Sequence, residues 1–238
     1  MILRSASAAS CALLLAACGS EPTSIEGLDR CTYFPAIEAS WSKAPPELEG
    51  PGGRVTGALA LDLAAWTGSG HDALELDPSD HVAFDDRDFF GPARLDLDWR
   101  VTDVTVAGRA GGWLGRRLRA EAIFGFELES IELDVADVSD RRIEVGPCLG
   151  AQATIRIFDR LSIQGRWQEY LSLFGNGWDG IAEGRGEQWR AGLVCEATSS
   201  LELFGGWSWW KYVREAPSSE SDVRLKLSGP MVALRFRL

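Results

Sequence analysis

The chain reads RLDLDWRV from Arg94 to Val101, so charged and apolar residues alternate without exception. Successive side chains of a β-strand point to opposite faces of a sheet, and the pattern therefore predicts a strand with one charged and one apolar face. The apolar side chains are those of Leu95, Leu97, Trp99 and Val101.

Similar alternation recurs to the end of the chain, in segments near the length that a tilted transmembrane strand needs. The predicted strands are residues 93–101, 104–114, 118–129, 142–157, 161–174, 187–197, 201–214 and 222–238. Residues 54–66 and 81–90 could add a further hairpin. The sequence therefore predicts an all-β fold, an antiparallel up-and-down transmembrane β-barrel of 8 to 10 strands.

The predicted connections alternate in length. Short turns are expected at 102–103, 115–117, 158–160 and 198–200, because these turn lengths keep the polar faces together across each hairpin. Longer connections are expected near 130–141, 175–186 and 215–222. Such asymmetry is typical of outer-membrane barrels, which have short periplasmic turns and long extracellular loops.

The N-terminus predicts export. Arg4 precedes a short stretch of apolar and small residues, Ala6 to Ala17, which is too short to span a bilayer but suits a signal-peptide core. It ends in Leu15-Ala16-Ala17-Cys18-Gly19, which resembles the lipobox of bacterial lipoproteins. Residues 1–17 would then be a lipoprotein signal peptide, with Cys18 as the lipidated residue. Gly19, in place of an aspartate, favours the outer membrane.

The remaining chain divides into two parts. Residues 18–53, rich in proline and glycine, are expected to form a lipidated N-terminus and flexible tether. Residues 54–238 are expected to form one β-barrel domain, since barrels commonly reach this size as a single unit.

Charge narrows the possible partners. The formal net charge is −11, and removal of Arg4 with the signal would make it −12. This charge argues against nucleic acid as a partner. No stretch after the signal offers about 18 consecutive apolar residues, so a membrane-spanning form must be a closed barrel.

Several motifs toward the C-terminus contain glycine and aromatic residues. They are Gly146-Pro147-Cys148-Leu149-Gly150, Leu161-Ser162, Leu171-Ser172-Leu173-Phe174-Gly175, and the ending from Leu227-Ser228-Gly229-Pro230 to Leu234-Arg235-Phe236-Arg237-Leu238. In these motifs residues 91–238 resemble the closing hairpins of Legionella-type major outer-membrane proteins, a pore-forming family. The resemblance implies a barrel in contact with outer-membrane lipid, inserted by the barrel-assembly machinery.

Charged residues on the polar face form a candidate site, because closure would bring the first three predicted strands beside the last. They are Asp96, Asp98, Arg109, Glu121, Arg235 and Arg237. Since side chains fill a narrow barrel, we expect a structural salt-bridge network; an ion path is the alternative. Leu227 and Arg235 are an even number of residues apart, so a regular strand would place both on the same face. Because one is apolar and the other charged, a β-bulge at Gly229-Pro230 is expected between them.

Other candidate sites have weaker patterns. Trp99, Trp189, Trp207 and Trp209 predict a girdle at a membrane interface, with a sugar-stacking platform as the alternative. His71 and His81 lack the converging partners that catalysis requires. Cys148 and Cys195 are expected to be unbridged. The sequence predicts no catalytic residue, no metal and no cofactor.

Two functions stay open. The first is a monomeric, lipid-anchored β-barrel of the cell outer membrane, with a structural or weakly pore-like, non-enzymatic role. The second is a lipid-anchored soluble barrel of lipocalin type, which binds a small apolar ligand inside and carries its charges outside. The two differ in which face of the alternating strands points inward.

Overall fold

The computed structural model describes residues 23–30, 32–43, 48–50, 53–55, 57–173, 184–215 and 221–238. Their regular elements are all strands, which confirms the predicted all-β class. The strands are β1 (Ile25–Asp29), β2 (Phe34–Lys43), β3 (Leu48–Gly50), β4 (Gly53–Val55), β5 (Gly57–Leu76), β6 (His81–Phe84), β7 (Arg87–Phe90), β8 (Ala93–Leu114), β9 (Leu118–Val135), β10 (Val138–Phe158), β11 (Leu161–Leu171), β12 (Gly184–Glu196), β13 (Leu201–Arg214) and β14 (Val223–Arg237). Within this part of the chain, no helix has the length and apolar character needed to cross a membrane.

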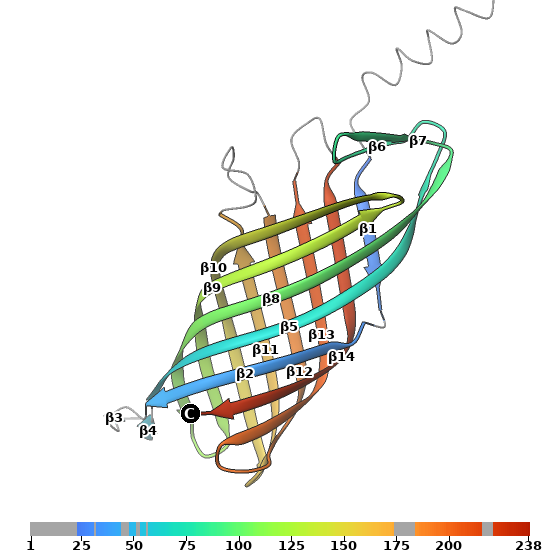
Figure 1. Ribbon diagram of the computed structural model, residues 1–238. Coiled ribbons are helices and arrows are strands. Elements are labelled where there is room, and N and C mark those ends of the chain that lie inside the picture. Colours follow the sequence, from blue (N-terminus) through green and yellow to red (C-terminus); the bar gives the residue numbers. More distant parts are fainter. Residues whose placement is uncertain are drawn as a thin grey trace, which may run out of the picture.

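Nine strands close into a ring in the order β2-β5-β8-β9-β10-β11-β12-β13-β14, as Figure 1 shows. Neighbours in the ring are antiparallel except at the closure, where β14 runs parallel to β2. Because every antiparallel step reverses direction, the first and ninth strands point the same way and must pair in parallel. Strand β1 belongs to the same sheet and pairs in parallel with the first half of β14.

The ring has two distinct ends. The turn end holds the β8–β9, β10–β11 and β12–β13 turns and the C-terminus, and the cap end holds the β6–β7 hairpin and the β9–β10 turn (Figure 1). Arg87 of β7 donates a hydrogen bond of 2.8 Å to Asp137 of the β9–β10 turn. This bond lowers the pKa of Asp137 and ties the two cap-end hairpins together.

Two predicted connections are wrong. Residues 102–103 do not form a turn, because β8 runs unbroken from Ala93 to Leu114. Asp103 points inward, where the Thr105 hydroxyl donates to its carboxylate at 3.1 Å. The long connection predicted near 130–141 is a tight turn, in which Ala136 has a positive φ of 55°. Strands β9 and β10 therefore extend several residues farther than the sequence suggested.

The N-terminal boundary also differs from the prediction. Strands β1 and β2 lie within residues 18–53, the segment predicted as a tether, and both pair with β14. Residues 81–90 form the separate β6–β7 hairpin instead of joining the ring. The predicted lipidation residue Cys18 and most of the predicted connections at 175–186 and 215–222 lie outside the described residues.

The predicted bulge at Gly229-Pro230 is absent from β14. Its register with β13 continues without a shift from Val223 to Phe236. Leu227 and Arg235 therefore both point inward, because the interior itself changes from apolar to charged along the strand.

Candidate functional site

The outer surface of the ring changes character along each long strand. In β9 the outward side chains are apolar from Leu118 to Leu128 and polar at Ser130, Glu132 and Asp134. In β5 they are apolar from Leu59 to Ala65, and the outward residues that follow include Thr67, Ser69 and His71. We call the outward apolar surface near the turn end the apolar belt. Its side chains include Leu59, Leu61, Leu63, Val106, Phe124, Phe126, Leu128, Leu149, Ile155, Ile163, Leu193, Leu203, Val232 and Leu234.

Three tryptophans lie side by side at the edge of the apolar belt. The strand register places Trp167 opposite Trp189 and Trp189 opposite Trp209. Glu187 accepts hydrogen bonds from the indole N–H groups of Trp167 at 3.1 Å and of Trp189 at 2.8 Å. The next outward row toward the cap end carries Glu169, Glu187, Lys211 and Lys226. The tryptophans therefore mark a boundary between an apolar and a charged surface.

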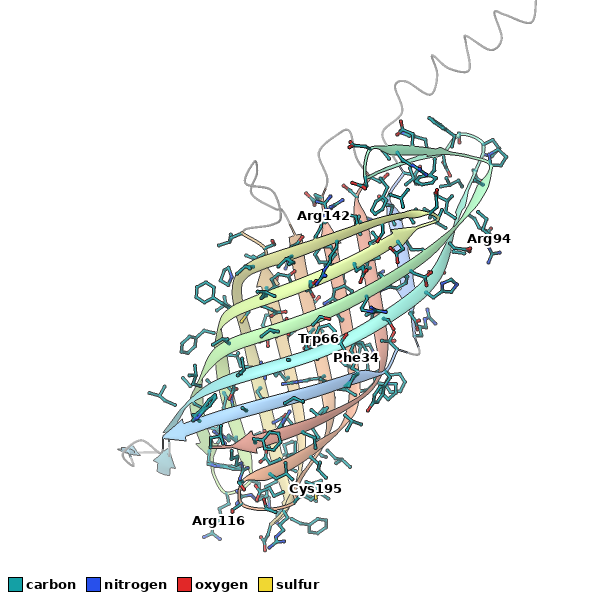
Figure 2. The ribbon with its side chains drawn as sticks, viewed as in Figure 1. Phe34, Trp66, Arg94, Arg116, Arg142 and Cys195 are labelled. Carbon is teal, nitrogen blue, oxygen red and sulfur yellow. The ribbon has the colours of Figure 1, made fainter. Side chains whose placement is uncertain are left out.

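The interior changes in the opposite sense. At the cap end it is packed with apolar side chains, which include Phe34, Trp66, Leu97, Trp99, Leu133, Val135, Tyr212, Leu225 and Leu227. Phe34 and Trp66, labelled in Figure 2, lie with their ring centroids 5.6 Å apart. Near the cap end the sheet is thus apolar inside and polar outside.

Between this core and the turn end lies a layer of buried acidic side chains that accept hydrogen bonds from neutral donors. Trp210 donates from its indole N–H to Glu129 at 2.7 Å, and Tyr212 donates from its hydroxyl to Glu144 at 2.5 Å. The Tyr170 hydroxyl donates to Glu129, and its oxygen lies 3.2 Å from Glu144. Asp103 and Glu127 complete the layer, with Gln168 donating to Glu127 at 2.5 Å. These bonds fix the interior between the apolar core and the turn end.

Near the turn end, arginines and carboxylates fill the interior. Glu38 of β2 pairs with both Arg190 and Arg235. Arg109 pairs with Asp62 and with Glu121, the latter at 3.1 Å, and Arg119 pairs with Glu121 at 2.7 Å. Buried charges need such partners, because removal from water is costly.

A cavity of about 310 Å³ opens among these groups toward the turn end. Its lining includes six arginines, Arg109, Arg119, Arg156, Arg166, Arg235 and Arg237, and four carboxylates, Glu38, Asp62, Glu196 and Glu202. Arg156 and Arg237 are exposed, whereas Arg166 and Arg235 are buried. The cavity is therefore a charged pocket with its deep wall inside the ring.

The predicted charge network divides between two places. Arg109, Glu121 and Arg235 lie inside, and Arg237 pairs at the turn end with Glu196 at 3.0 Å and with Glu202. Asp96 and Asp98 were placed in this network wrongly, since both point outward near the cap end. Asp98 instead lies 2.8 Å from Nδ1 of His71 on the outer surface. The error follows from assigning the charged face of β8 to the interior, whereas its apolar face lies there.

Several interior residues went unrecognised in the sequence. Glu38 lay in the predicted tether, although Ile37 and Trp41 alternate with Glu38 and Ser40 and could have revealed the strand. Arg166 and Arg190 lie on the predicted polar face, but alternation alone does not distinguish them from the other polar residues of that face. Arg190 contacts Glu38 of β2, a strand distant in sequence, so local pattern does not reveal its role.

The remaining candidate residues lie apart from the charged cavity. Cys148 and Cys195 are both free, the former buried and the latter exposed. His81 stacks on Phe90 of the β6–β7 hairpin, with ring centroids 5.6 Å apart. The described residues contain no cluster of His, Cys, Asp and Glu suited to a metal ion. Comparison with models of known families and with curated proteins found no match to this chain.

Proposed function

We propose that the protein is a β-barrel of the bacterial outer membrane, embedded through its apolar belt and closed by packed side chains near the cap end. Its role is structural and non-enzymatic, and its N-terminus carries a lipid on Cys18. The cap-end half projects from the bilayer. One observation carries this proposal. Near the turn end the strands are apolar outside and charged inside, whereas near the cap end they are polar outside and apolar inside.

The apolar belt has the dimensions that a bilayer requires. A tilted transmembrane strand needs about 9–11 residues, and the outward apolar run of β9 from Leu118 to Leu128 agrees with that length. A monomeric soluble protein seldom exposes a continuous apolar surface of this extent, yet Phe126 is 64% exposed and Leu149 is 64% exposed. The row of tryptophans at the belt's edge suits the interface between hydrocarbon and water.

The lipocalin-type alternative is favoured by one observation, the apolar interior and charged exterior near the cap end. That half alone resembles a soluble barrel. However, the apolar core fills this space with large side chains, including Phe34, Trp66 and Trp99, and the turn-end half presents the opposite arrangement. The packed core therefore favours a closed barrel and argues against both a ligand-binding cup and an open pore.

Membrane extraction separates the two proposals. A Cys18→Ala protein that is still exported should stay in the membrane pellet after alkaline carbonate treatment, because the apolar belt anchors it without the lipid. Release into the soluble fraction would favour the lipocalin-type barrel. In planar bilayers the unmodified protein should show no stable conductance; steady channel currents would contradict the closed interior.

A further inference from the structure

Arg166 is a buried cation whose positive charge is incompletely compensated. Its side chain lies in β11 and lines the charged cavity, and only 5% of the residue is exposed. One terminal nitrogen donates to Gln168 at 2.6 Å, whereas Nε has no hydrogen-bond partner. Among the described residues Arg166 forms no salt bridge. A buried guanidinium without a carboxylate is costly, since desolvation opposes its charge.

Two carboxylates near Arg166 are engaged by other arginines, and a third, Glu127, accepts a hydrogen bond from Gln168 at 2.5 Å. Glu38 is shared between Arg190 and Arg235, while Asp62 pairs with Arg109. One terminal nitrogen of Arg235 also lacks a hydrogen-bond partner, and Arg235 lines the same cavity. Two buried guanidinium groups that line the same cavity therefore each keep a donor nitrogen without a hydrogen-bond partner.

We propose that this cavity binds a compact multivalent oxyanion of the phosphate type, held by Arg166 and Arg235. A planar guanidinium presents paired N–H donors that match the oxygens of such an anion. The cavity volume of about 310 Å³ exceeds the roughly 30 Å³ that one water occupies in the liquid, so a small hydrated anion can be accommodated. The exposed Arg156 at the mouth attracts anions toward the deep site, whereas Arg237 beside it is paired with Glu196 and Glu202. This inference goes beyond the structural role and does not depend on the orientation of the barrel.

Calorimetric titration of inorganic phosphate into the full-length protein, folded in detergent, tests the site. We expect saturable binding to the unmodified protein, and Arg166→Gln should weaken it by at least about tenfold, which corresponds to about 1.4 kcal/mol. Arg116→Gln is the matched control, because Arg116 is an exposed arginine at the same end of the ring (Figure 2). The control should retain the affinity of the unmodified protein. Absence of saturable binding, or equal loss in both variants, would overturn the proposal.

A second variant keeps the test decisive if Arg166→Gln does not fold. Gln164 lines the cavity, points to the same side of β11 as Arg166 and has an unpaired side-chain oxygen. Gln164→Glu preserves its shape but places a carboxylate near the arginine. This internal anion should raise the melting temperature and abolish the additional stabilisation by phosphate, which a ligand of the folded state provides. Undiminished stabilisation by phosphate in Gln164→Glu would contradict the site.

Discussion

Glycine at position 70 leaves the space that the Trp99 side chain occupies. A Cβ atom added to Gly70 would lie 2.4 Å from the indole, and one added to Gly27 of β1 would lie 2.8 Å from the same ring. Trp99 thus covers the inside of the gap between β1 and β5. Across that gap the Leu28 amide donates to Asp72 at 3.0 Å. Gly27 and Gly70 therefore leave room for the Trp99 indole, which covers the site where β1 and β5 are adjacent but not paired.

We therefore expect Gly70→Ala to destabilise the protein, because the buried indole must shift. Overpacking of this kind costs about 1–3 kcal/mol. Equilibrium unfolding in denaturant, with the protein in detergent, measures the change. The matched variant is Gly205→Ala, since a Cβ atom there meets no atom within 4 Å. If both variants unfold alike, Trp99 does not occupy the space left by Gly70.

Glu38 holds two buried arginines, and its loss should be more damaging than the loss of an exposed partner. We expect Glu38→Gln to cost about 3–5 kcal/mol, because Arg190 and Arg235 would lose their shared charge. Glu75→Gln is the control, since the Glu75–Arg94 pair at 3.6 Å is exposed and such pairs contribute about 0–1 kcal/mol. Comparable unfolding midpoints for the two variants would show that Glu38 is not a buried bridge.

At the scale of a strand, alternation predicts which residues share a face but does not identify the inward face. The partition of β8 into Leu95, Leu97 and Trp99 against Asp96 and Asp98 was correct, yet the charged set lies outside. The assignment for the first part of β9 was correct, with Glu121 inside and Phe126 outside. The difference arises because β8 begins in the cap-end half, whereas β9 begins near the turn end.

The same change in surface character predicts opposite tolerances within one strand. Phe126→Arg should impair folding into liposomes, because an arginine facing lipid costs about 2–4 kcal/mol at the midplane. Glu132→Arg lies on the same outward face of β9, beyond the apolar belt, and should fold nearly as well as the unmodified protein. Folded yield is measured by resistance to added protease. Normal folding of Phe126→Arg would argue that lipid does not contact this surface.

At the scale of the whole molecule, the local sequence pattern predicted the strands and turns but not how the ring closes. Strand segments and the turns at 115–117, 158–160 and 198–200 were recognisable, because hairpins depend on neighbouring residues. The closure was not, since β14 pairs with β1 and β2 from the opposite end of the chain, and the prolines and glycines of that segment suggested a tether. Arg109, Glu121 and Arg235 of the site were predicted, but Glu38 was not, because it reaches Arg190 and Arg235 only after closure.

The inversion of the two surfaces is tested most directly by a depth profile along β9. Single cysteines at Phe124, Phe126, Leu128, Ser130, Glu132 and Asp134, in a chain whose native cysteines are replaced, would carry nitroxide labels in liposomes. Collision rates with oxygen and with a water-soluble nickel complex report lipid and water contact. We predict that oxygen dominates at the first three positions and nickel at the last three. Nickel access at all six positions would contradict a membrane-embedded belt.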